Sequence, residues 1–250
     1  MTVSAWIARL DQLVWGPWML ALLLGTGVFL TLRTRFLPWR NLGWALRSTF
    51  SRASRTGARG AGDVSPFSAL MTTLAATIGT GNIAGVATAL VAGGPGALVW
   101  MELSALLGLS TKCAECLLAV KYRRRSDRGE MCGGPMYTMR YGLRQRRLGA
   151  VLAALFALFT VLASLGMGNM AQANSIAQAL SGSFAVPPRI TGAVVAVLAL
   201  AVILGGIRRI AGICSAVVPA MAVFYLLAGL AVLLGHLSAV PAALAEMLRL

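Results

Sequence analysis

The chain has 250 residues, of which 58% are hydrophobic and only 12% are charged, and its net charge is +15. Soluble globular domains carry about 25% charged residues, so the composition excludes that class and indicates a membrane protein. The basic residues lie in short segments between apolar runs, without the interleaved aromatic residues of a base-stacking surface. We therefore expect a lipid bilayer, and no nucleic acid, as a partner.

About 20 apolar residues cross the hydrocarbon core of a bilayer, and the sequence contains six candidate runs in succession. The predicted spans are residues 14–32, 65–92, 97–120, 149–180, 190–207 and 213–234. Between the first two spans, residues 41–50 are expected to form a short amphipathic helix at the membrane surface. The chain is thus predicted to be a multi-pass protein of the cell membrane.

The distribution of basic residues predicts the orientation of these spans. The loops 33–63, 121–147 and 208–209 hold 18 of the 22 lysines and arginines, and they alternate with loops that hold almost none. Cytoplasmic loops carry the excess of positive charge in membrane proteins. We therefore expect the three basic loops to be cytoplasmic and both ends of the chain to lie outside.

The second span, residues 65–92, has no charged residue, but its middle reads Gly79-Thr80-Gly81-Asn82. Glycine costs about 1 kcal/mol relative to alanine inside a helix, so this run weakens the helix where it lies deepest in the membrane. Freed backbone groups cannot face hydrocarbon unpaired, so such a break survives only where it lines a cavity. In transporters, helices broken at the midplane bind the substrate and its coupling ion, and we predict such a site here.

The two ends of the predicted break offer different groups. A half-helix beginning near Asn82 would present free N–H groups and a positive dipole end, which suit a carboxylate. The preceding half-helix would end with backbone carbonyls from Ala76 to Gly79, which suit Na⁺. The competing interpretation is close helix packing through small residues, which Gly81 and Gly85 also fit.

A second group of polar residues lies in the fourth span. Gln172, with Asn169 and Asn174 nearby, is a polar group on a helix of membrane length. Amides at this depth face the protein interior. They either bind a substrate or hydrogen-bond a neighbouring helix, and the sequence does not separate these two roles.

The third span contains charged residues and cysteines. Lys112 and Glu115 are three residues apart, so they are expected to pair on one helix face. Cys113 and Cys116 lie in an apolar helix without a second cysteine pair, which favours helix packing over a metal or redox role. No nucleophile–base pair or metal cluster lies in a predicted span, so we do not expect an enzyme.

Several motifs, in order along residues 66–219, resemble the alanine or glycine:cation symporter (sodium:alanine symporter) family. They are Gly79-Thr80-Gly81-Asn82-Ile83-Ala84-Gly85, Gly93-Gly94-Pro95-Gly96-Ala97, Thr111-Lys112 to Glu115, Gly133-Gly134-Pro135-Met136-Tyr137, and Gly168-Asn169-Met170 with Gln172-Ala173-Asn174-Ser175. The resemblance implies Na⁺- or H⁺-coupled uptake of small neutral amino acids such as alanine or glycine. No cofactor is implied beyond Na⁺ as the coupling ion.

The resemblance also implies a fold and a set of site residues. The fold is an all-α, LeuT-like architecture of inverted repeats, in which a broken helix and a glutamine-bearing helix line the substrate site. Thr80, Gly81, Asn82 and Gln172 stand at those positions, and the backbone carbonyls of Ala76 and Gly79 stand where Na⁺ is expected.

The same resemblance implies a division of the chain. Residues 1–64 would form an extra N-terminal membrane helix and a basic loop, residues 65–236 the first five-helix repeat, and residues 237–250 a tail. The family has two such repeats, so we expect this chain to act as an N-terminal half together with a C-terminal half. The alternative is a membrane interaction or scaffold protein without transport activity of its own.

Overall fold

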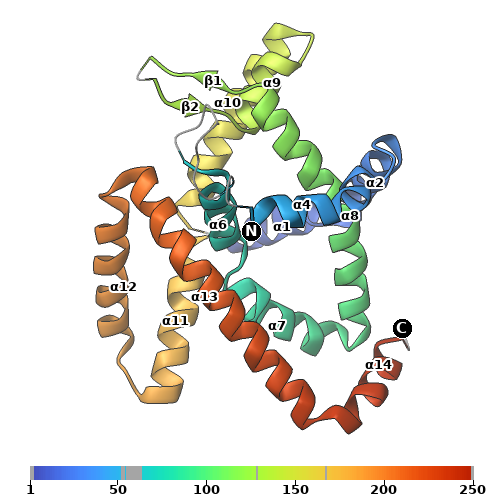
Figure 1. The fold of residues 1–250 in the computed structure, drawn as a ribbon, viewed down its shortest axis with the longest axis vertical. Coiled ribbons are helices and arrows are strands. Elements are labelled where there is room, and N and C mark those ends of the chain that lie inside the picture. Colours follow the sequence, from blue (N-terminus) through green and yellow to red (C-terminus); the bar gives the residue numbers. More distant parts are fainter. Residues whose placement is uncertain (1–2, 52–53, 55–63, 128, 167, 249–250) are drawn as a thin grey trace.

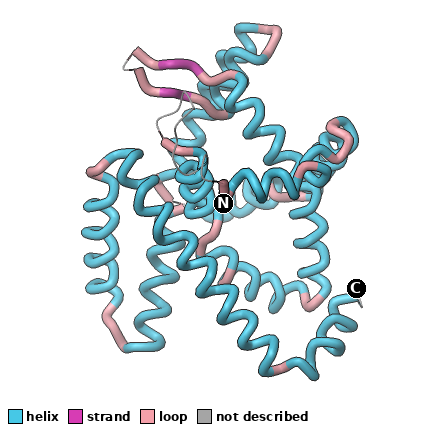
Figure 2. The backbone as a smooth tube through the Cα atoms, viewed as in Figure 1, coloured by secondary structure: helices cyan, strands magenta, loops and turns pink. Residues whose placement is uncertain are grey.

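The computed structural model describes residues 3–51, 54, 64–127, 129–166 and 168–248, and these residues are mostly helical (Figures 1 and 2). The α-helices are α1 (Val3–Val14), α2 (Pro17–Arg33), α3 (Leu37–Arg40), α4 (Leu42–Thr49), α6 (Pro66–Thr77), α7 (Ala84–Gly93), α8 (Gly96–Lys121), α9 (Pro135–Gly142), α10 (Arg146–Ser164), α11 (Asn169–Phe184), α12 (Pro188–Ile203), α13 (Gly206–Gly235) and α14 (Val240–Leu248). Two 3-10 turns, η1 (Thr80–Asn82) and η2 (Leu237–Ala239), separate some of them. The short helix predicted for residues 41–50 is confirmed as α4.

The expectation of a purely helical chain is wrong in one place. In the second basic loop, β1 (Arg124–Arg125) and β2 (Met131–Cys132) pair antiparallel, with Arg124 opposite Cys132. The ribbon is closed by a hydrogen bond from Ser126 N to Glu130 O of 2.8 Å and by Gly129 at φ +81°. Glycine adopts this left-handed conformation without the steric cost of a side chain, so it favours a turn here over a helix.

Fewer helices can cross a membrane than the six predicted. In the described part of the chain, four segments are long and apolar enough: Ser4–Arg33, Gly96–Lys121, Arg146–Phe184 and Gly206–Gly235. The pair Pro66–Thr77 and Thr80–Gly93, bent by 61°, makes a fifth if it is one broken span.

The fifth predicted span, residues 190–207, corresponds to α12, which has only 16 residues. Its helix stops at Ile203 because Gly205 and Gly206 follow, and Gly206 has a φ of +66°. Arg208 and Arg209 therefore lie in the first turn of α13 and do not close α12.

The fourth predicted span, residues 149–180, is also interrupted. Helix α10 ends at Ser164 and α11 begins at Asn169. Leu165 N and Gly166 N donate to carbonyls only three residues back, Leu162 O and Ala163 O, both at 3.3 Å. The interruption falls at Gly166 and Gly168, where glycine weakens the helix as it does in the second span.

Small residues bring pairs of helices close together. In α2 and α8, a Cβ atom on Gly27 would lie 3.0 Å from Leu107 Cβ, and Thr31 Oγ1 donates to Ser110 Oγ at 2.8 Å. Ser110 is 1% exposed. Helices α6 and α13 are likewise joined by a hydrogen bond from Ser215 Oγ to Ser68 Oγ of 2.9 Å. Such small and hydroxyl-bearing contacts are typical of helix packing inside membranes.

Basic loops and uncharged turns lie at opposite ends of the helices. In Figure 1, the β1–β2 ribbon and α9 lie at the top, the turn from α12 to α13 lies below them at the left, and the uncharged turns from α7 to α8 and from α11 to α12 lie at the bottom. A cavity of about 610 Å³ lined by residues 130–132 and 205–208 places two of the basic loops beside each other. This arrangement agrees with the predicted common location of these loops on one side of the membrane.

Most large apolar side chains of the described helices are exposed. The buried hydrophobic residues are few and mostly small: Met71, Ala153, Ala177, Ala211 and Val218. In a membrane protein, the exposed apolar faces contact lipid or further helices.

Candidate functional site

The predicted break in the second span is present. Ser65 Oγ caps the start of α6 by accepting from Ser68 N at 3.1 Å, and Pro66 occupies the first turn. The helix ends at Thr77, and the backbone runs extended through Ile78 and Gly79 into η1. The second half-helix, α7, begins at Ala84, two residues after Asn82, and the 3-10 turn lies between the two halves.

Backbone groups are left free on both sides of this break. The last hydrogen bond of α6 runs from Ile78 N to Leu74 O at 2.7 Å. Among the described residues, the carbonyls of 75–77 therefore accept no backbone hydrogen bond. On the other side, the amides of 79–81 and of 84–86 donate none within the described backbone. Such groups need a partner when water is excluded.

Of the residues with free amides, Gly79 and Thr80 line a cavity of about 570 Å³, which is within the usual size range of small-molecule sites. Three parts of the chain line this cavity. They are the break that separates α6 from α7, helix α11, and helix α13. The lining residues are Ile78, Gly79, Thr80, Asn82, Ile83, Gln172, Met221, Ala222, Tyr225 and Leu226.

Gln172 reaches the break because Gly79 has no side chain. A Cβ atom on Gly79 would lie 3.0 Å from Gln172 Nε2 and 3.3 Å from Gln172 Cδ. The side-chain amide of α11 therefore lies directly against the extended backbone of the broken helix. Two motifs that are about 90 residues apart in the sequence are thus brought to one cavity.

The structure brings together only some of the residues predicted for the site. Gly79, Thr80, Asn82 and Gln172 line the cavity. Gly81 does not line it, and a Cβ atom there would meet nothing within 4 Å. Ala76, in the last turn of α6, and Asn169 and Asn174 of α11 do not line the cavity either.

The contribution of α13 was not predicted. Met221, Ala222, Tyr225 and Leu226 form one face of this helix, because residues four apart lie above one another. The packing of α6 on α13, through Ser68 and Ser215, places this face beside the break. The one signal in the sequence was Tyr225, the only tyrosine in a predicted span.

Comparison with known proteins identifies the family. A sequence model of the sodium:alanine symporter family matches residues 1–249, nearly the whole chain. The chain belongs to the sodium:alanine symporter family. The relatives in this family are transporters and not enzymes, and the several apolar helices of the described chain agree with a multi-pass membrane protein.

Several curated relatives in this family are similar over most of the chain. The sodium/alanine symporter AgcS of Methanococcus maripaludis is 54% identical over 204 residues, which cover 82% of this chain and 45% of that protein. An uncharacterized transporter of Haemophilus influenzae is 51% identical over 212 residues, covering 84% of this chain and 45% of that protein. The probable sodium/glutamine symporter GlnT of Bacillus subtilis is 35% identical over 206 residues, covering 80% and 40%. The chain thus spans a little under half the length of these relatives.

The charged residues of α8 lie away from this cavity. Lys112 Nζ and Glu115 Oε2 are 3.1 Å apart, which confirms the predicted pair. Both side chains are about half exposed, at 58% and 46%. Cys113 and Cys116 are free thiols. Neither pair lines the cavity at the break.

Proposed function

We propose that the helix break and its cavity form part of the site at which a small neutral amino acid, such as alanine or glycine, is transported together with Na⁺. The observation that carries this proposal is the contact between Gln172 and Gly79 at a broken, apolar helix. The relatives named as sodium-dependent carriers of alanine and glutamine support it.

The substrate would be held through its charged ends. The free amides of 79–81 and the positive end of α7 suit its carboxylate. The side-chain oxygens of Thr80, Asn82 and Gln172 can accept hydrogen bonds from its ammonium group. The face of α13, with Met221, Ala222 and Leu226, offers an apolar wall to a small side chain.

The coupling ion would bind at the other side of the break. The carbonyls of 75–77 lack backbone donors among the described residues, and that of Gly79 accepts only from Asn82 N, at 3.0 Å. Carbonyl oxygens at unwound helix ends coordinate Na⁺ in transporters of this kind. Among the described residues, the cavity lining contains no carboxylate and no histidine that could carry a proton, which supports Na⁺ rather than H⁺ as the coupling ion.

The whole transporter would have the LeuT-like arrangement of inverted repeats. Residues 65–236 would form one repeat, following the extra helix and basic loop of residues 1–64, with residues 237–250 as a tail. The broken helix and the greater length of the relatives support this assignment. The exposed apolar faces of the described helices offer packing surface to a second repeat.

The test is alanine uptake by the full-length protein reconstituted in liposomes, driven by a Na⁺ gradient. Replacing a site group that hydrogen-bonds the substrate costs about 1–3 kcal/mol, so Gln172→Ala should weaken apparent alanine affinity by about 5- to 150-fold. Gln178→Ala, on the same helix but outside the cavity lining, is the matched control and should transport normally. Unchanged affinity in a well-folded Gln172→Ala variant would remove Gln172 from the site.

A further inference from the structure

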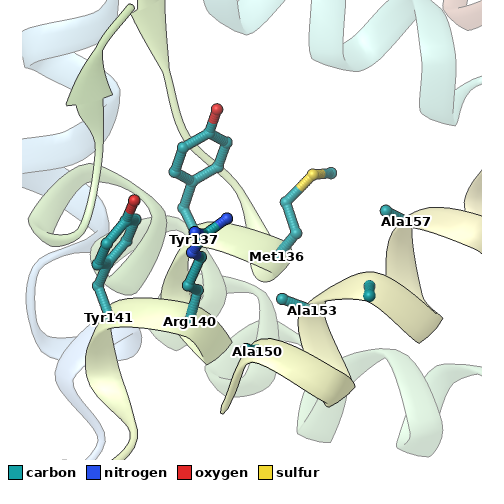
Figure 3. A pocket seen from close by; sticks show the side chains of 8 residues that line it. Met136, Tyr137, Arg140, Tyr141, Ala150, Ala153 and Ala157 are labelled. Carbon is teal, nitrogen blue, oxygen red and sulfur yellow. The ribbon is translucent and has the colours of Figure 1, made fainter. Parts of the chain in front are cut away.

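A second cavity, of about 310 Å³, lies between α9 and α10 and shares no residue with the cavity at the helix break (Figure 3). Its lining residues are Met136, Tyr137, Arg140, Tyr141, Ala150, Ala153, Ala154 and Ala157. Figure 3 shows Arg140 and the two tyrosines on α9, and the alanines on α10 across from them. The cavity therefore has a polar wall and an apolar wall.

Arg140 in the polar wall, and Arg124 beside it, carry positive charge that no acid among the described residues neutralises. The guanidinium carbons of Arg140 and Arg124 lie 5.8 Å and 4.8 Å from the centre of the Tyr141 ring. The rings of Tyr137 and Tyr141 stack at 6.2 Å. In the described part of the chain, the one ion pair is that of Lys112 with Glu115, so neither arginine has a carboxylate partner there. Contacts with a ring face leave the guanidinium N–H groups available to an anion.

The tyrosine hydroxyls add neutral hydrogen-bond donors to this wall. Cys132 on β2 raises the pKa of the Tyr137 phenol, first through a hydrogen bond and then through its charge. Tyr141 lies one helical turn further along α9.

The apolar wall leads from the membrane surface into the bilayer. Helix α10 begins with Arg146 and Arg147 and then runs apolar to Ser164. The four alanines follow the spacing i, i+3, i+4 and i+7, so they form one face of this helix. From Ala150 to Ala157 this face descends about 10 Å, at 1.5 Å per residue. Because alanine ends at Cβ, the face is a shallow groove along the span.

We propose that this cavity binds an anionic phospholipid from the cytoplasmic leaflet. Its phosphate contacts Arg140 and the tyrosine hydroxyls, and one acyl chain lies along the alanine face of α10. The positive charge selects an anionic over a zwitterionic headgroup. The apolar half of the lining selects a lipid over a free phosphate ion, which has nothing to place there. Basic pockets between membrane helices recognise anionic headgroups in this way.

The test uses the full-length protein, purified and stripped of lipid, and native mass spectrometry with added phosphatidylglycerol or phosphatidylcholine. We expect one phosphatidylglycerol to bind more tightly than phosphatidylcholine. One basic residue near an anionic surface contributes about 1 kcal/mol, so Arg140→Gln should weaken phosphatidylglycerol binding by about fivefold. Arg144→Gln, in the same basic loop but outside the lining, is the matched control and should bind normally.

Two further arms separate the headgroup from the acyl chain. Ala154→Phe fills the groove from an exposed position of α10 and should weaken phosphatidylglycerol binding, while inorganic phosphate should not displace the lipid. Each variant must keep the Tm of the unaltered protein in detergent, which shows that it is folded. Equal binding of the two lipids, normal binding by Arg140→Gln or Ala154→Phe, or displacement by phosphate would each overturn the proposal.

Discussion

Gly79 has a specific role that follows from its missing side chain. Its φ of −145° and ψ of −167° are open to any residue, so its conformation does not require glycine. The close approach of the Gln172 side chain favours glycine, since a Cβ atom would lie 3.0 Å from Nε2 and the flexible amide would have to move. Gly81, two residues later, has open space at the same position. The two glycines of the motif are therefore expected to differ in their tolerance of substitution.

Gly79→Ala should reduce apparent alanine affinity by about five- to tenfold, because displacing Gln172 loses about one hydrogen bond to the substrate. Gly81→Ala keeps the backbone N–H and meets no neighbour, so its affinity should change less than twofold. The measurement is the concentration dependence of Na⁺-driven alanine uptake for both variants of the full-length protein. Equal effects of the two substitutions would contradict the contact between Gly79 and Gln172.

At this scale the sequence predicted four of the ten residues that line the cavity. Two glycines, a threonine and an asparagine inside an uncharged run indicated a break, and Gln172 was a polar group at membrane depth. The sequence could not show that Gly81 and Ala76 lie off the cavity, because this depends on the 3-10 turn at Thr80–Asn82. It also could not show that a face of α13 completes the wall, because that depends on how α6 and α13 pack.

Helices are positioned by close contacts between small residues. The pair α2 and α8 is the clearest case, with Gly27 against Leu107 and the hydrogen bond between Thr31 and Ser110. Gly25, half a turn away on α2, is exposed and would meet nothing within 4 Å. Substituting alanine at Gly25 and at Gly27 therefore distinguishes the effect of helix propensity from the effect of helix packing.

Gly25→Ala should raise stability by up to about 1 kcal/mol, the gain of alanine over glycine inside a helix. Gly27→Ala has the same gain, but its Cβ would lie 3.0 Å from Leu107 Cβ and 3.2 Å from Leu107 O, so the helices must move apart. Overpacking of this kind costs about 1–3 kcal/mol, and we expect a lower Tm. Thermal unfolding of the two variants in one detergent checks this, and a Tm for Gly27→Ala at or above that of Gly25→Ala would contradict it.

At the scale of elements, hydropathy located the apolar segments well and their interruptions less well. The break at Gly79–Asn82 was predicted from two glycines followed by an asparagine in an uncharged run. The interruption after Ser164 was not predicted, although Gly166-Met167-Gly168-Asn169 repeats that pattern in the sequence. The ribbon of β1 and β2 was missed because strands of two residues have no periodicity to detect.

The whole molecule has two chemically different ends. The β1–β2 ribbon and the first turn of α13 carry arginines, and the turn from α11 to α12 is uncharged (Figure 1). Since positive loops stay in the cytoplasm, the first two are expected inside and the third outside. The charge pattern alone predicted this arrangement, which the positions of the loops in the structure support.

Single cysteines at Ser126 and Gly182, introduced after removal of the four native cysteines, test this orientation. Ser126→Cys should not react with an impermeant thiol reagent in intact cells, and Gly182→Cys should react. After the cells are opened, both should react. Labelling of Ser126→Cys from outside would reverse the orientation.

The central claim is that amino acid and Na⁺ meet at the cavity formed by the broken helix, Gln172 and α13. The most direct measurement is protection of a cysteine in the α13 wall from a small thiol reagent, in the full-length protein. Ala222→Cys places a thiol on this wall, and Ala220→Cys places one outside the lining as a control. We predict that alanine slows labelling of Ala222→Cys in Na⁺ but not in choline, and that it leaves labelling of Ala220→Cys unchanged. The proposed site would be contradicted if Ala222→Cys still transported alanine but alanine did not slow its labelling in Na⁺.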